Sequence, residues 1–235
     1  MKVEIWSDVM CPFCYIGKRN FETALDKFGE KEHLEVVWKS FQLDPSLPET
    51  AGETYEEYLA KRKGMSREQV RDMFANVKET AKQAGLDYDF DKTVMVNSHK
   101  AHEVIQFAKT RSLGNEAEEI LFKAFFTEGR NIADTETLIR LGEEIGLDKA
   151  ELQAALSEKK YADAVNQDIQ EARKLGVNGV PFFVMDRKYA VSGAQPPEVF
   201  LETLEKAYAE WKKLNPDNFL EIKPGQSCSS DGQCA

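Results

Sequence analysis

Two cysteines near the N-terminus are the residues whose types and spacing point most directly to chemistry. Cys11-Pro12-Phe13-Cys14 follows a short alternating apolar run and opens a helical pattern. A cysteine at a helix N-terminus faces unpaired backbone N–H groups and the positive end of the helix dipole, which stabilise a thiolate over a thiol. The two-residue spacing brings Cys14 beside Cys11, and Pro12 suits the first helical turn. The pattern predicts thiol–disulfide exchange, in which an exposed Cys11 attacks and a deeper Cys14 resolves the mixed disulfide.

Zinc binding is the main alternative for this spacing, because structural zinc sites also use cysteine pairs. A tetrahedral site needs a second ligand pair, and the remaining cysteines, Cys228 and Cys234, stand more than 200 residues away in a polar tail. The three histidines, His33, His99 and His102, have no finger-like spacing to a cysteine. A redox pair is therefore the preferred interpretation, and we expect no metal site and no cofactor.

Composition sets the broad class of protein. The chain has 235 residues, is 42% hydrophobic and carries a formal net charge of −10. It can bury a sizeable core, and its acidic surface argues against nucleic acid or an anionic membrane as the main partner. No apolar run is long enough to span a bilayer. The first residues alternate as a strand and leave no room for a signal peptide, so we expect a cytoplasmic protein, in which a lasting structural disulfide is disfavoured.

Hydrophobic periodicity gives the order of the elements. Alternation predicts strands near both ends of the chain, and a 3.6-residue period predicts helices between them. The expected order is a strand over 2–7, a helix over 12–29, a strand over 34–41, a helical block over about 53–176, a hairpin over 180–185 and 189–192, and a last helix from Pro196. The first three elements form a β-α-β unit with parallel strands.

Three segments carry a family resemblance in addition to this order: residues 7–17, 176–184 and 192–198, with the sequences SDVMCPFCYIG, GVNGVPFFV and SGAQPPE. With them, the chain resembles the DsbA-like thioredoxin-fold family, and within it the FrnE-like dithiol-disulfide isomerases. The resemblance implies an α/β thioredoxin fold with a large inserted all-helical domain. The expected division is a first thioredoxin-fold segment over 1–44, the helical insertion over 45–159, a second thioredoxin-fold segment over 160–214 and a cysteine-containing tail over 215–235.

The resemblance also implies a substrate-binding edge. Pro181 begins a strand-like run, where proline marks an edge or a bend. In the family the matching proline is cis and lies against the cysteine pair, which exposes the backbone of Val180 to an extended substrate and places Phe13 beside it. The Pro-Phe pair offers no extra donor to the thiolate, unlike a Pro-His pair, which implies an intermediate redox poise. Expected partners are thiol- or disulfide-containing proteins, with glutathione as a further thiol partner.

Several polar residues are weaker candidates. Glu4 and Asp8 lie close to the cysteine pair and could relay protons, but solvated charges at the strand edge are the preferred interpretation. Residues 116–119 are interpreted as a solvated helix face. His99 and His102 fall in a segment that resembles the family's cavity-facing helix, although a capped helix with packed or solvated histidines explains the same residues.

The tail cysteines form a possible second redox pair. Cys228 and Cys234 are separated by a polar spacer that contains glycine. Some FrnE-like proteins carry such a C-terminal pair, which implies an accessory disulfide that exchanges with Cys11. Inert tail thiols, or an adventitious metal site, are the alternatives.

Three functions remain open. The preferred one is a protein dithiol-disulfide oxidoreductase or isomerase. The second is a glutathione-dependent small-molecule enzyme similar to kappa-type glutathione transferases and hydroxychromene carboxylate isomerases, which typically carry serine at the first cysteine position. Having both Cys11 and Cys14 favours the first function. The third is a redox-regulated chaperone or metal-handling protein. The sequence leaves the physiological substrate, the electron donor and the oligomeric state undefined.

Overall fold

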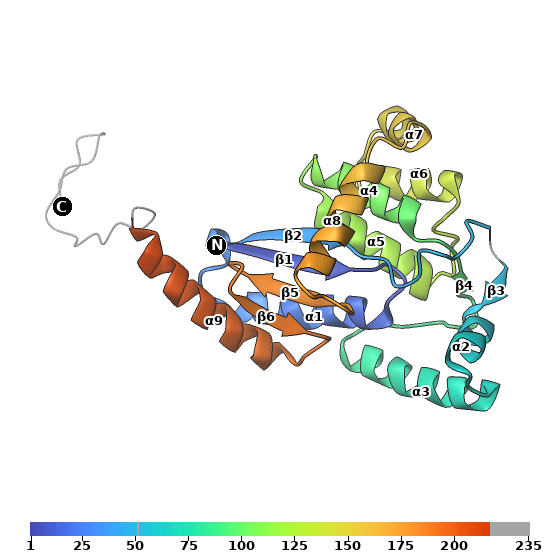
Figure 1. Cartoon of the computed structure of the whole chain (residues 1–235), viewed down its shortest axis with the longest axis horizontal. Coiled ribbons are helices and arrows are strands. Elements are labelled where there is room, and N and C mark those ends of the chain that lie inside the picture. Colours follow the sequence, from blue (N-terminus) through green and yellow to red (C-terminus); the bar gives the residue numbers. More distant parts are fainter. Residues whose placement is uncertain (51, 217–235) are drawn as a thin grey trace, which may run out of the picture.

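A four-stranded sheet lies at the centre of the computed structural model, which describes residues 1–50 and 52–216 (Figure 1). β1 (Lys2–Ser7) pairs in parallel with β2 (Glu35–Ser40) and antiparallel with β5 (Phe182–Met185), which pairs antiparallel with β6 (Tyr189–Ser192). The strand order is β2-β1-β5-β6. The predicted β-α-β unit and the predicted hairpin are confirmed, and the sheet has the topology of a thioredoxin fold.

Helices cover both faces of the sheet. Alternation along β1 sends Ile5 to one face and Trp6 to the other. α1 (Pro12–Lys27) and α9 (Pro197–Leu214) pack on the Ile5 face, where the rings of Phe21, Phe183 and Phe200 contact one another. α8 (Ala162–Lys174) packs on the Trp6 face. The end of β1 and the start of α1 are therefore held inside the molecule.

The helices that come between β2 and α8 in the chain lie on the side of the sheet where β1 ends (Figure 1). These are α2 (Tyr55–Lys63), α3 (Arg67–Gln83), α4 (His99–Lys109), α5 (Gly114–Phe126), α6 (Thr135–Glu144) and α7 (Lys149–Ser157). Side-chain caps begin four of them: Thr54 forms a capping box with Glu57, Ser66 forms one with Gln69, and Asp134 and Asp148 each accept a backbone N–H three residues on. None of the described helices is long and apolar enough to cross a membrane.

The prediction that the insertion is entirely helical is wrong in one detail. β3 (Glu53–Thr54) and β4 (Val94–Met95) pair antiparallel within it. Each strand has only two residues, which is too short for alternation to be recognised in the sequence. The Tyr55 N–H donates a hydrogen bond to the Thr93 carbonyl at 3.3 Å and extends the pairing of β3 with β4. This pairing joins the start of α2 to the segment that precedes α4.

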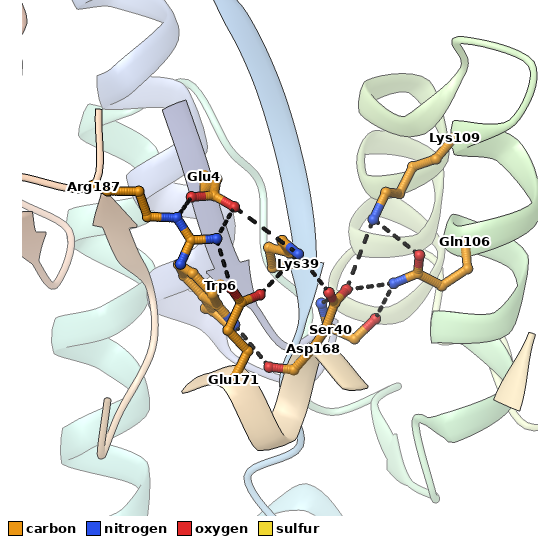
Figure 2. Close-up of polar contacts among 9 residues, drawn as sticks. All are labelled: Glu4, Trp6, Lys39, Ser40, Gln106, Lys109, Asp168, Glu171 and Arg187. Carbon is orange, nitrogen blue, oxygen red and sulfur yellow. Dashed lines mark hydrogen bonds and ion pairs between the residues drawn. The ribbon is translucent and has the colours of Figure 1, made fainter. Parts of the chain in front are cut away.

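A buried polar network joins the sheet to α8 and α4 on the Trp6 face (Figure 2). The Asp168 carboxylate accepts hydrogen bonds from Lys39 Nζ at 2.9 Å, the Ser40 N–H at 3.0 Å and Gln106 Nε2 at 2.6 Å. Asp168 is 6% exposed, so these donors replace water almost entirely. The network fixes α4, and with it the helices that follow, relative to β2.

Glu4 belongs to the same network. It is 1% exposed and accepts from Arg187 Nη2 at 2.6 Å, while Lys39 lies 4.0 Å away. The interpretation of Glu4 as a solvated strand-edge charge is wrong, because β1 is a central strand and Arg187 covers this position. Glu4 therefore contributes to the packing of the Trp6 face.

Asp168→Asn is expected to lower the free energy of unfolding by roughly 2 kcal/mol, because hydrogen bonds to a buried charge contribute about that much and the amide cannot satisfy all three donors. Glu171→Gln is the control: it lies on the same helix, but its side chain is 32% exposed, so we expect a loss below about 1 kcal/mol. Urea unfolding of both variants at pH 7 measures the difference. Equal losses would contradict a central role for Asp168.

Candidate active site

Cys11 and Cys14 stand at the junction of β1 and α1. Cys11 is the N-cap residue of α1, and Pro12 occupies the first helical position. The Cys11 N–H donates to the Asp8 carbonyl at 2.9 Å, and the Cys14 N–H donates to the Cys11 carbonyl at 2.9 Å. Both cysteines are free thiols. The turn from strand to helix thus places two sulfur atoms one helical turn apart.

Cys11 is less exposed than its place at a helix start predicts. Its relative exposure is 4%, because the segment before β5 and the helices that follow β2 close around it. The Sγ atom lies 3.4 Å from the Val180 carbonyl oxygen. A substrate therefore reaches Cys11 through a pocket and not across an open surface.

Val180 lies against Cys11 and is followed by Pro181. The peptide bond between Val180 and Pro181 is cis. The Pro181 carbonyl accepts from the Gly193 N–H at 2.8 Å, which ties this segment to the end of β6. A Cβ atom on Gly17 would lie 2.9 Å from Cγ of Pro181, so the first turns of α1 approach this proline as closely as glycine allows.

An apolar pocket of about 290 Å³ opens beside Cys11. Phe13, which is 43% exposed, forms part of its wall, and Arg62 and Lys63 bring positive charge to it. The apolar side chains that line it come mostly from α2, α3 and the segment before β4, and include Tyr55, Leu59, Met73, Phe74, Val77 and Phe90. The pocket can accept an apolar group attached to a sulfur that reacts at Cys11.

Cys14 is enclosed behind Cys11, with a relative exposure of 1%. Burial raises the pKa of the Cys14 thiol well above its ordinary value, and the hydrogen bond to Cys11 raises it further. The Asp8 backbone and the Ser7 hydroxyl act in the opposite direction by hydrogen bonding to the sulfur. Cys14 is therefore protonated at neutral pH and needs a proton acceptor before it can act as a nucleophile.

Asp8 shapes the loop that carries Cys11. It is fully buried, so the interpretation of a solvated strand-edge charge is wrong here too. Its Oδ1 accepts the Met10 N–H at 3.3 Å, and its Oδ2 accepts the Leu43 N–H at 2.7 Å. The carboxylate accepts backbone N–H groups of two loops that have no carbonyl partner there. Residue type alone does not distinguish this role from that of a charge on the surface.

The two histidines of α4 do not line the pocket beside Cys11. His102 is fully buried, and its Nε2 lies 3.4 Å from Asp8 Oδ1. His99 is partly exposed, and its Nδ1 lies 3.3 Å from Glu103 Oε1. Only His102 therefore approaches the candidate site, behind Asp8 and away from the substrate side.

Glu118 of α5 is a buried acidic residue near the candidate site that sequence reasoning misses, and it accepts a hydrogen bond from the Ser7 hydroxyl at 3.4 Å. The interpretation of residues 116–119 as a solvated face is wrong at this position, because Glu118 is 1% exposed. Burial raises its pKa to about 8, against the opposing effect of Lys18. Its spacing to Leu121, Phe122 and Phe125 places it on the apolar face of the helix, and this spacing is the available signal.

The tail cysteines, Cys228 and Cys234, lie outside the described residues, so their accessory role stays a prediction.

Glu30, Glu32 and His33 form a cluster of possible metal-ligand atoms away from the cysteine pair. Acidic groups of this kind are common without a bound ion, and the cluster is not part of the candidate site.

The sheet order and the helices on both faces define a protein of thioredoxin fold. The chain belongs to the DSBA-like thioredoxin domain family, whose model matches residues 2–205, and it is therefore a DsbA-like oxidoreductase. The crystal structure of a probable DsbA oxidoreductase from Streptomyces coelicolor is similar to it, with a TM-score of 0.85 and 38% identity, covering 100% of this chain and 98% of that chain.

Two other relatives extend the comparison. The uncharacterized protein YwbO of Bacillus subtilis is 29% identical over 90% of this chain and 97% of its own length. The cytosolic disulfide reductase DsbM of Pseudomonas aeruginosa, solved with GSH, has a TM-score of 0.60 at 18% identity and covers 92% of this chain and 100% of that chain. At that identity the likeness to DsbM concerns the fold alone.

Proposed function

We propose that this protein is a dithiol-disulfide oxidoreductase that acts on protein thiols and disulfides through Cys11 and Cys14. The observation that carries the proposal is the placement of Cys11: a thiol at the N-terminus of α1, 3.4 Å from the Val180 carbonyl and on the wall of an apolar pocket. Cys11 attacks the substrate disulfide, and Cys14 then displaces the substrate sulfur from Cys11. Isomerisation follows when the mixed disulfide is released by another substrate thiol.

The substrate is proposed to bind as an extended segment along Val180 and Pro181. The contact between Cys11 Sγ and the Val180 carbonyl supports this, because a substrate sulfur bonded to Cys11 would bring its own backbone beside this edge. Phe13 and the apolar pocket would hold a large apolar side chain next to the reacting cysteine. A cytoplasmic location and an exchange partner in the tail remain predictions.

A glutathione-dependent activity on small molecules is the second candidate. The apolar pocket of about 290 Å³ supports it, since this volume is close to the lower end of the range for small-molecule sites. Arg62 and Lys63 at the same pocket could face the carboxylates of a glutathione molecule. The presence of Cys14 favours the protein substrate, because conjugation does not require a resolving thiol.

Two assays separate these candidates. Reduction of insulin in the presence of dithiothreitol is expected to be accelerated by the wild-type protein, since Cys11 and Cys14 form a complete exchange pair. Conjugation of glutathione to a small electrophile is expected to proceed at the uncatalysed rate. Catalysed conjugation without insulin reduction would contradict the proposed function and favour the second candidate.

A further inference from the structure

The charged side chains that line the apolar pocket beside Cys11 are all positive. They are Arg62 and Lys63, in the last turn of α2, and no acidic side chain stands among the described residues of the pocket wall. The whole chain carries a formal net charge of −10, so this wall has the opposite sign to the molecule as a whole. An apolar cleft with charge of one sign concentrates groups of the other sign.

Basic residues in the last turn of a helix are common, because they complement the helix dipole. The run of Lys61, Arg62 and Lys63 would therefore not indicate a site by itself. Lys63 differs from Lys61 because its charge is not compensated: it is exposed and forms no ion pair within the described part of the chain, whereas Lys61 pairs with Glu53 at 2.9 Å. Lys63 is thus an uncompensated positive charge on the wall of the pocket that leads to Cys11.

Arg62 is held against the wall but keeps part of its hydrogen-bonding capacity. Its guanidinium group forms an ion pair with the buried Asp44 and donates to the Leu43 carbonyl at 3.4 Å. Asp44 also accepts from the Tyr58 hydroxyl at 2.8 Å, which fixes the carboxylate that holds Arg62. These contacts use two of the five guanidinium N–H groups, and the side chain is 49% exposed. The other N–H groups remain available to a carboxylate from a substrate.

The pocket is open at the Arg62 end. Tyr58, Arg62 and Met95 also line a second hollow of about 620 Å³, which is lined on another side by residues of the segment 44–48. A chain that enters the pocket beside Cys11 can therefore continue past Arg62. This continuity favours a segment of a protein over glutathione, which has no apolar side chain to place in the pocket.

We propose that this protein selects disulfide substrates that carry an apolar side chain next to the reacting cysteine and an acidic side chain beyond it. The inference rests on the proposed function of the Cys11–Cys14 pair and adds the class of substrate to it. The apolar side chain occupies the pocket, and the carboxylate binds Lys63 and the available N–H groups of Arg62. The positive wall also accelerates the encounter, because opposite charges steer association.

The test compares three peptides that differ only in charge. Each carries phenylalanine on both sides of one cysteine and glutamate, glutamine or lysine beyond each phenylalanine, so the result does not depend on the direction in which the chain binds. The cysteine is activated as a pyridyl disulfide, whose leaving group is neutral. When the Cys11 sulfur bonds to the peptide sulfur, the bond between the peptide sulfur and the pyridyl sulfur breaks. The released pyridinethione is followed by its absorbance.

The measured quantity is the ratio of the second-order rate constants for the glutamate and lysine peptides, each divided by its rate constant with dithiothreitol. This division removes the effect of charge on the disulfide itself, and the ratio does not depend on the fraction of active protein. All proteins carry Cys228→Ser and Cys234→Ser, with Cys11 and Cys14 unchanged. We expect a ratio of about 10 at low ionic strength, the order that two exposed ion pairs supply, and a fall towards unity at high salt, where these charges are screened.

Three variants locate the charge that is responsible. Lys63→Glu should bring the ratio below one, and Lys63→Gln should leave about 3, because one of the two positive charges remains. Lys82→Glu is the matched control: Lys82 is also an exposed lysine in the last turn of a helix that contributes to the pocket, but it does not line the pocket. This substitution changes the net charge as much as Lys63→Glu does and should keep the wild-type ratio.

Three outcomes would overturn the inference. A wild-type ratio near unity, or a ratio that Lys82→Glu lowers as much as Lys63→Glu, would exclude a carboxylate site at Lys63. Glutathione activated as the same pyridyl disulfide should react more slowly than the glutamate peptide, and a faster reaction would assign the positive wall to glutathione. Failure of every peptide to form a disulfide with Cys11 of the wild type would instead refute the proposed function, and the substrate class with it.

Discussion

Cys11→Ser is expected to abolish insulin reduction, and Cys14→Ser is expected to abolish turnover while mixed disulfides accumulate. Serine cannot form the covalent sulfur intermediate, so the first variant stops before any bond to substrate forms. The second variant still presents the Cys11 thiol at the pocket but lacks the buried sulfur that displaces the substrate. Insulin turbidity under dithiothreitol measures turnover, and gel mobility without reductant detects the adducts.

Phe13→Ala is the control for these two substitutions. It changes a 43% exposed wall residue between the cysteines and leaves both sulfur atoms in place. We expect weaker substrate binding with catalysis retained. Comparable turnover by Cys11→Ser and the wild type would show that the first cysteine is not the nucleophile.

Glu118→Gln is expected to be more stable than the wild type, by a difference in unfolding free energy that grows as pH rises. The pKa of Glu118 is about 8 in the folded protein, because burial raises it, and 4.5 in an ordinary carboxyl group. Between these values the folded state holds a proton that the unfolded state releases, so the wild type loses stability with increasing pH. Glutamine stays neutral and removes this loss. The variant should match the wild type near pH 4 and exceed it by roughly 3 kcal/mol at pH 7.

Glu119→Gln provides a control of opposite sign on the adjacent residue. Burial alone would raise its pKa, but the Arg19 hydrogen bond and the charge of Lys18 lower it to about 2. Its folded-state carboxylate therefore adds stability above pH 4.5, which is lost as pH falls towards 2. Glu119→Gln should be less stable than the wild type at pH 7. Urea unfolding from pH 4 to pH 8 measures the free energy of unfolding of both variants and the wild type. A difference between Glu118→Gln and the wild type that does not depend on pH would contradict the raised pKa of Glu118.

The parts of the fold and site that follow from local sequence patterns can be predicted. Cys11 and Cys14 are recognisable because their spacing and the strand-to-helix change are local, and the final hairpin is equally clear from alternation and turn residues. The family resemblance adds the place of Pro181, which a proline at a strand start does not reveal by itself. Helix caps such as the capping box of Ser66 and Gln69 are also set by residues close together in the sequence.

The buried charges cannot be predicted from residue type. Glu4, Asp8 and Glu118 resemble surface groups because isolated acidic residues are usually solvated. Each is buried through a partner far away in sequence: Arg187 for Glu4, the Leu43 backbone for Asp8 and Ser7 for Glu118. The burial of Cys11 escapes prediction for the same reason, since its cover comes from α2, α3 and the segment around Val180. Such contacts exist only once the helices between β2 and β5 are placed against the sheet.

The attachment site of a trapped substrate tests the role of Cys11 most directly. Cys14→Ser, with Cys228 and Cys234 also changed to serine, is incubated with a disulfide-bonded peptide, digested without reductant and mapped by mass spectrometry. We predict one peptide per protein, bound through a disulfide to Cys11 and released by dithiothreitol. A protein that carries no peptide on Cys11 while the wild type still reduces insulin would contradict this prediction.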